Sequence, residues 1–134
     1  MNFYKAVFLF EAIVINAGVG IFCFFVPAGF VGQFFPGAME QTPLELTRWY
    51  GVLLWVLAYA MLRILPLRED RMLFPLVEAL LFGDLAHLAA SGLFFQARPI
   101  LDFPFLFMLG MSIFLAIVRI VWLIKYHRKQ QPAA

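Results

Sequence analysis

The sequence predicts an all-α integral membrane protein, a four-helix bundle with both termini in the cytoplasm. Its 134 residues are 64% hydrophobic and 13% charged, and that charged fraction is about half the value of a typical soluble domain. Four apolar segments, at about residues 6–26, 44–65, 72–96 and 103–126, are each long enough to cross a hydrocarbon core of about 30 Å. We therefore expect a single transmembrane domain over residues 1–134.

The first segment, 6–26, is expected to be a retained transmembrane helix. It is long, it contains Glu11, and it lacks the small-x-small cleavage site of a signal peptide. It ends at Pro27, where the apolar loop 27–43 begins. This loop is rich in Phe, Gly and Pro and has no Lys or Arg, so we expect it to fold back onto the helices or to enter the membrane interface. A lid over an opening between helices and simple interfacial packing of its phenylalanines are both open interpretations.

Two segments begin with recognisable capping residues. Before the segment 44–65, Thr42 is the predicted N-cap, Pro43 the first helical residue and Glu45 the partner of a capping box. Asp102 is the predicted N-cap of the segment 103–126. The segment 72–96 has no comparable signal.

The basic residues indicate the orientation. The N-terminus, the turn 66–71 and the tail, with the adjoining helix ends, carry seven basic residues, whereas the opposite side carries two. An excess of Lys and Arg marks the cytoplasmic side of a membrane protein. The seven are Lys5, Arg63, Arg68, Arg71, Lys125, Arg128 and Lys129, and the two are Arg48 and Arg98.

The segment 72–96 carries the most unusual polar pattern. Asp84 lies at its centre, and Asp84, His87 and Ser91 follow the i, i+3, i+7 spacing that places residues on one face of a helix. Ionisable groups near the bilayer midplane are expensive, so they mark a functional site or a buried pair.

The embedded polar residues fall into two layers when depth is counted from each segment's centre at about 1.5 Å per residue. The cytoplasmic layer contains Glu11, Tyr59, Glu78 and Arg119, and the second layer contains Asn16, Arg48, Trp55, Asp84, His87, Ser91 and Ser112. The structural interpretation of the first layer is an ion cluster of Arg119 with Glu11 and Glu78. For the second layer it is an Asp84–Arg48 pair, with His87 hydrogen-bonded to a neighbour.

The functional interpretation places acid/base chemistry in these layers. A carboxyl group without a partner in a low-dielectric environment can act as a proton donor, and an adjacent His can relay the proton. The candidate catalytic residues are Asp84, His87, Arg48, Glu78 and Glu11. The candidate substrate-binding residues are Trp55, Tyr59, Asn16, Ser91 and Ser112.

Other chemistries have little support in the sequence. There are only two histidines and one cysteine, so we expect no metal site built by the protein and no cofactor. Axial haem ligation by His87 is the one cofactor alternative, and nothing nearby specifies it. The net charge of +2 and the absence of a basic-aromatic pattern exclude nucleic acid as an expected partner.

Two short motifs carry a resemblance to a known family. Leu46-x-Arg48-x-x-Gly51 opens the second segment, and Gly83-Asp84-x-x-His87 lies in the third. Together with the layout of four segments over nearly the whole chain, they resemble small four-helix membrane proteins of the DoxX-like type. The size and the acid-in-membrane pattern are also similar to small membrane-bound epoxide hydrolases and cyclases, and to sterol-isomerase-like bundles. This resemblance implies acid/base chemistry on a lipid-soluble substrate.

Three functions follow as hypotheses. The first is an integral membrane enzyme that opens, isomerises or cyclises an epoxide-type ring in a lipophilic small molecule taken from the membrane lipids. The second is a non-catalytic accessory or scaffolding protein. The third is a small transporter, which would be a homo-oligomer because carriers of this size are usually built from two copies.

Overall fold

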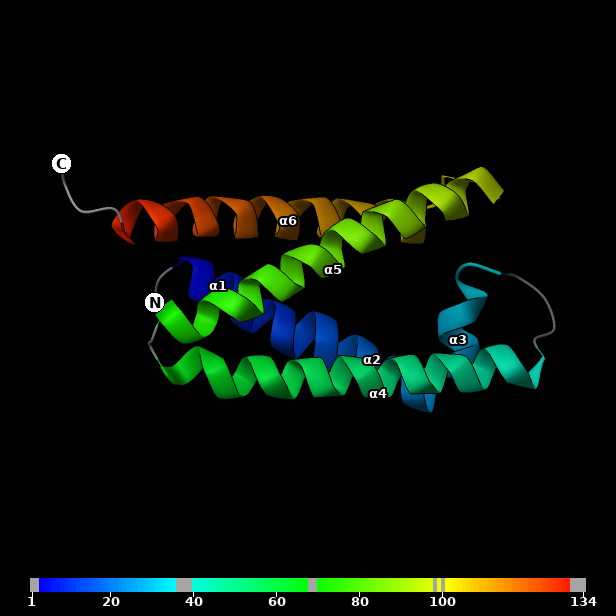
Figure 1. Cartoon of the computed structure of the whole chain (residues 1–134). Coiled ribbons are helices and arrows are strands. Elements are labelled where there is room, and N and C mark those ends of the chain that lie inside the picture. Colours follow the sequence, from blue (N-terminus) through cyan, green and yellow to red (C-terminus); the bar gives the residue numbers. More distant parts are fainter. Residues whose placement is uncertain (1–2, 36–39, 68–69, 98, 100, 131–134) are drawn as a thin grey trace. The chain divides into compact units, whose positions relative to one another are not determined.

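The computed structural model describes residues 3–35, 40–67, 70–97, 99 and 101–130, with the side chains of residues 70 and 97 excepted. Most of these residues are helical, and there is no strand among them. Four helical stretches are long and apolar enough to cross a membrane: Phe3–Phe25, Gln41–Leu67, Arg71–Gln96 and Phe103–Gln130. They correspond to the four predicted segments. The chain divides into two compact units, Met1–Arg68 and Glu69–Ala134, each of which is a helical hairpin (Figure 1).

The first hairpin pairs a composite helix with one long helix. The composite helix consists of α1 (Phe3–Phe10), the π-helix η1 (Glu11–Gly18) and α2 (Val19–Phe25), and its partner is α4 (Gln41–Ile64), which continues into the short 3₁₀ turn η2 (Leu65–Leu67). The predicted first segment is therefore correct in extent but not a uniform α-helix. Its end before Pro27 is as predicted, because Val26 leaves the helical conformation.

The π-helix changes which residues face the partner helix. Buried positions along the composite helix recur every fourth residue, at Phe8, Ala12, Asn16 and Gly20. An α-helix of 3.6 residues per turn would rotate such a row by about 40° at each step. The wider i→i+5 turns of a π-helix reduce this rotation, so that the row stays on the side that packs against α4.

Two glycines allow the helices of this hairpin to cross closely. A Cβ atom added at Gly51 of α4 would lie 2.7 Å from the backbone oxygen of Gly20, and one added at Gly20 would lie 2.7 Å from the Trp55 ring. Real Cβ atoms do not approach other atoms so closely, so this crossing requires the absence of a side chain on both helices. Trp55 closes the crossing by packing on Phe24 with ring centroids 5.0 Å apart.

The apolar loop folds back onto the hairpin, as one interpretation predicts. It begins with the short helix α3 (Pro27–Gly32), and Phe30 contacts both Phe22 of α2 and Tyr50 of α4, with ring centroids 6.1 and 6.5 Å apart. The rest of the described loop continues this aromatic packing, because Phe34 lies 5.7 Å from Phe30.

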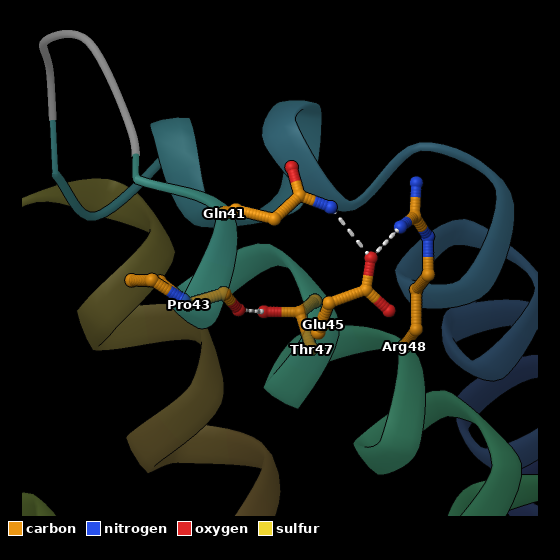
Figure 2. Close-up of polar contacts among 5 residues, drawn as sticks. All are labelled: Gln41, Pro43, Glu45, Thr47 and Arg48. Atoms are coloured by element: carbon orange, nitrogen blue, oxygen red, sulfur yellow. Dashed lines mark hydrogen bonds and ion pairs between the residues drawn. The ribbon is translucent and has the colours of Figure 1, made fainter.

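The predicted capping box at the start of α4 is wrong. The helix begins at Gln41, the residue before it, Glu40, makes no capping bond through its side chain, and Thr42 already lies inside the first turn. Glu45 instead accepts hydrogen bonds from Gln41 and Arg48, as Figure 2 shows. Pro43 is therefore the third helical residue, whereas the sequence predicts it as the first. It is tolerated there because the first four N–H groups of a helix have no internal acceptor.

The second hairpin consists of two long antiparallel helices, α5 (Asp70–Ala97) and α6 (Phe103–Gln130). Aromatic contacts join them at both ends: Phe74 lies 4.9 Å from Tyr126, and Phe94 lies 5.8 Å from Phe105. The predicted N-cap of α6 is confirmed, because the Phe105 N–H donates to Asp102 Oδ1 at 3.1 Å.

Candidate functional site

One face of α5 carries both the hairpin core and the polar residues that the sequence singles out. Its buried residues are Leu73, Val77, Leu80 and Ser91. Leu73, Val77 and Leu80 are four and three residues apart, and Asp84, His87 and Ser91 continue this alternation, so the apolar stripe and the polar residues form one row. An amphipathic pattern of this kind directs Asp84 toward α6 and not toward lipid.

Arg119 of α6 is the partner of Asp84. Its guanidinium Nη1 donates to Asp84 Oδ2 in an ion pair and lies 3.4 Å from the Leu80 carbonyl oxygen. The pair is withdrawn from solvent, since the Arg119 side chain is 1% exposed and that of Asp84 is 12% exposed. Asp84 is consequently paired with a cation, whereas the functional interpretation of the sequence requires a carboxyl group without a partner.

The sequence predicts an ion cluster of Arg119 with Glu11 and Glu78, and its contact between Arg119 and Glu78 is wrong. Glu78 is exposed on α5 and makes no ion pair with Arg119 in the described part of the chain. It lies six residues before Asp84, which turns it about 120° away from the face that meets α6. The predicted contacts Arg119–Glu11 and Asp84–Arg48 join residues of different units, and they stay predictions.

The direction of the side chains explains why the sequence places Arg119 and Asp84 in different polar layers although they form a pair. Side chains on a helix lean toward its N-terminus, and α5 and α6 are antiparallel. Arg119 therefore leans toward the level of Asp84, and Asp84 leans toward that of Arg119. The long Arg side chain bridges the remaining difference in depth between the two Cα positions, and counting Cα depth alone misses this.

His87 lies one turn beyond the ion pair. Its Nε2 atom is buried and has no hydrogen-bond partner among the described residues, whereas the sequence predicts a bonded neighbour. Buried polar atoms without partners are uncommon in folded proteins, and each calls for an explanation such as a ligand or a reactive role. Ser91 is buried one turn further along the same face.

A second polar group lies in the first hairpin. Glu11 and Asn16 are buried on the π-helix, and the Asn16 amide donates to the sulfur of Met61 at 3.3 Å. A thioether is a weak acceptor, so this bond fixes the side chain at little energetic gain. π-Helical turns inside longer helices are frequent at functional sites; no sequence pattern used here predicts this one.

The other candidate residues occupy less enclosed positions. Arg48 is about two-fifths exposed and paired with Glu45 near the start of α4 (Figure 2). Trp55 is half-buried against Phe24, and Tyr59 is 67% exposed within its own hairpin, so its role in substrate binding stays a prediction. The buried stripe of α4 runs through Gly51, Ala58 and Met61, so Tyr59 is turned about 100° from it.

On α6, Ser112 is half-buried and lies seven residues before Arg119. Seven residues are about two turns of α-helix, so these two residues lie on one face. The second hairpin thus holds Asp84, His87, Ser91 and Ser112, while Glu11, Asn16, Arg48, Trp55 and Tyr59 belong to the first.

Three comparisons bear on identity. Neither protein-family models, nor curated proteins, nor solved structures give a match to this chain. The resemblance to DoxX-like membrane proteins and small epoxide hydrolases accordingly stays a prediction from two short motifs and a segment layout.

Proposed function

We propose that this chain is an integral membrane enzyme that performs acid/base chemistry on a lipophilic small molecule, with His87 as its proton-transferring group. The observation that carries the proposal is the buried, unpartnered Nε2 of His87, one turn from the Asp84–Arg119 pair. A hydrogen-bonding group of a substrate would supply the missing partner. In this proposal the two hairpins form a four-helix bundle, and both termini are cytoplasmic.

The reaction class is the opening of a strained oxygen ring by water. Asp84, kept as a carboxylate by Arg119, takes a proton from water while the water oxygen bonds to a ring carbon and the carbon–oxygen bond of the epoxide breaks. The leaving oxygen takes a proton from His87 in the tautomer that carries it on Nε2. Proton return from Asp84 to His87 completes the addition of one water and gives a diol.

A second candidate function has its own support. A buried Asp–Arg pair also serves to fix the register of two helices, and a non-catalytic accessory membrane protein needs no more than that. In this alternative Asp84 and Arg119 hold the second hairpin in one arrangement, and partner proteins or lipids contact its outer surface.

Turnover of a panel of terpene and fatty-acyl epoxides separates the two functions. We expect the parent protein to form diols and His87→Ala to lose roughly 10²- to 10⁴-fold in rate, the usual contribution of a positioned acid or base. His127→Ala is the matched control, because His127 is the exposed second histidine near the end of α6, and it should keep the parent's rate. Equal rates for the parent and His87→Ala would remove His87 from the chemistry. Absence of turnover by the parent favours the accessory function.

A further inference from the structure

One end of the second hairpin concentrates positive charge and aromatic rings. The last turns of α6 carry three basic residues within five positions, Lys125, Arg128 and Lys129, and all three are exposed. The first turn of α5 adds the exposed Arg71. The two helix ends are adjacent, because Phe74 of α5 contacts Tyr126 and His127 of α6 with ring centroids 4.9 and 5.4 Å apart.

The length of α6 places this end outside the hydrocarbon. Its 28 residues extend about 42 Å at 1.5 Å per residue, whereas the hydrocarbon core is about 30 Å thick. When Asp102, the N-cap of α6, lies at one surface of the hydrocarbon core, about 20 residues cross the core and Trp122 lies at the opposite surface. The basic residues then lie at the depth of the phospholipid headgroups.

The aromatic rings fit the same boundary. The rings of Trp122 and Tyr126 stack with centroids 5.4 Å apart and an interplanar angle of 14°, and Tyr126 also contacts the Phe74 ring. Trp and Tyr are enriched where hydrocarbon meets headgroups, since their rings are apolar and their polar atoms need water or headgroup partners. Trp122 is buried and Tyr126 is half-buried, so the cluster packs within the hairpin, and its position agrees with the boundary that the length of α6 gives.

We infer that this basic end, formed by Arg71, Lys125, Arg128 and Lys129, binds the phosphate groups of anionic phospholipids. Arg71 and Arg128 carry the inference most directly, because their side chains are exposed and make no ion pair among the described residues. Guanidinium groups bind phosphate through two parallel hydrogen bonds. Basic residues next to a membrane helix are also attracted to an anionic leaflet by charge alone.

The test measures which lipids the protein retains, and its Tm, in nanodiscs of phosphatidylcholine alone or of phosphatidylcholine mixed with phosphatidylglycerol. We expect native mass spectrometry to show preferential retention of phosphatidylglycerol and the mixture to raise the Tm. Arg71→Gln combined with Arg128→Gln should weaken the preference roughly tenfold. Arg71→Lys with Arg128→Lys, the control that keeps the charge and loses only the paired hydrogen bonds, should weaken it less.

Three results would overturn the inference. The first is equal retention of the two lipids by the parent, and the second is an unchanged preference in the double Gln variant. The third is stabilisation by free inorganic phosphate to the same extent in phosphatidylcholine alone, which would indicate a soluble anion as the ligand. Because both arginines are exposed, the variants should fold, and unchanged helicity by circular dichroism checks this.

Discussion

Arg119 and Asp84 are the residues on which the second hairpin depends most. Both side chains are withdrawn from solvent, and each supplies the charge that the other needs. Removing one member of a buried pair leaves an uncompensated charge, so we expect Arg119→Ala to lower stability by about 3–5 kcal/mol. The Tm in detergent measures the effect.

The double variant Asp84→Leu with Arg119→Leu is the control for this prediction. It removes both charges together, and apolar replacements of a buried pair are often neutral. It should therefore be more stable than Arg119→Ala. If Arg119→Ala melts like the parent, the pair is solvated in the protein and does not hold α5 to α6.

At the scale of single elements, the crossing of α2 and α4 tolerates no added side chain. Gly51→Ala brings a Cβ atom to within 2.7 Å of the Gly20 backbone oxygen, and backbone atoms cannot rotate away as a side chain can. We expect a loss of about 1–3 kcal/mol, typical of overpacking, read as a lower Tm.

Gly110→Ala on α6 is the matched control, because no atom lies within 4 Å of the added Cβ. Ala is the better helix former by about 1 kcal/mol, so this variant should be as stable as the parent or more so. Equal loss in both variants would indicate a general intolerance of alanine and no special contact at Gly51.

The start of α6 depends on its cap in a way that the start of α4 does not. Asp102→Ala removes the acceptor of the Phe105 N–H and should cost about 0.5–2 kcal/mol, whereas Asp102→Asn should retain most of that stability. Thr42→Ala on α4 should have little effect, because Thr42 lies inside the helix and is exposed. A larger loss in Thr42→Ala than in Asp102→Ala would support the predicted capping box and contradict the observed start of α4 at Gln41.

For the whole molecule, the distribution of Lys and Arg predicts that both termini face the cytoplasm. An Arg128→Cys variant tests this, with the buried Cys23 replaced by Ala to remove background labelling. In intact cells a membrane-impermeant maleimide should leave it unmodified until the membrane is permeabilised. Gln41→Cys, at the exposed start of α4, should react without permeabilisation, and the reverse pattern would invert the topology.

The helices of this protein could be predicted from local sequence patterns. Helix formation and helix ends depend on neighbours within one or two turns, so apolar length, Pro27 and Asp102 were enough to locate the four spanning segments closely. The shared face of Asp84, His87 and Ser91 was equally predictable, because it requires only the 3.6-residue turn.

The tertiary structure decided which residues meet. The pairing of Arg119 with Asp84, and not with Glu78, depends on the rotation and stagger of two antiparallel helices and on side chains that lean toward each other. The π-helix at Glu11–Gly18 and the close crossing at Gly20 and Gly51 likewise depend on a partner helix. The charges along one helix do not specify how the neighbouring helix is rotated or shifted along its axis. The residues that pair across two helices could therefore be identified only from the packed hairpins.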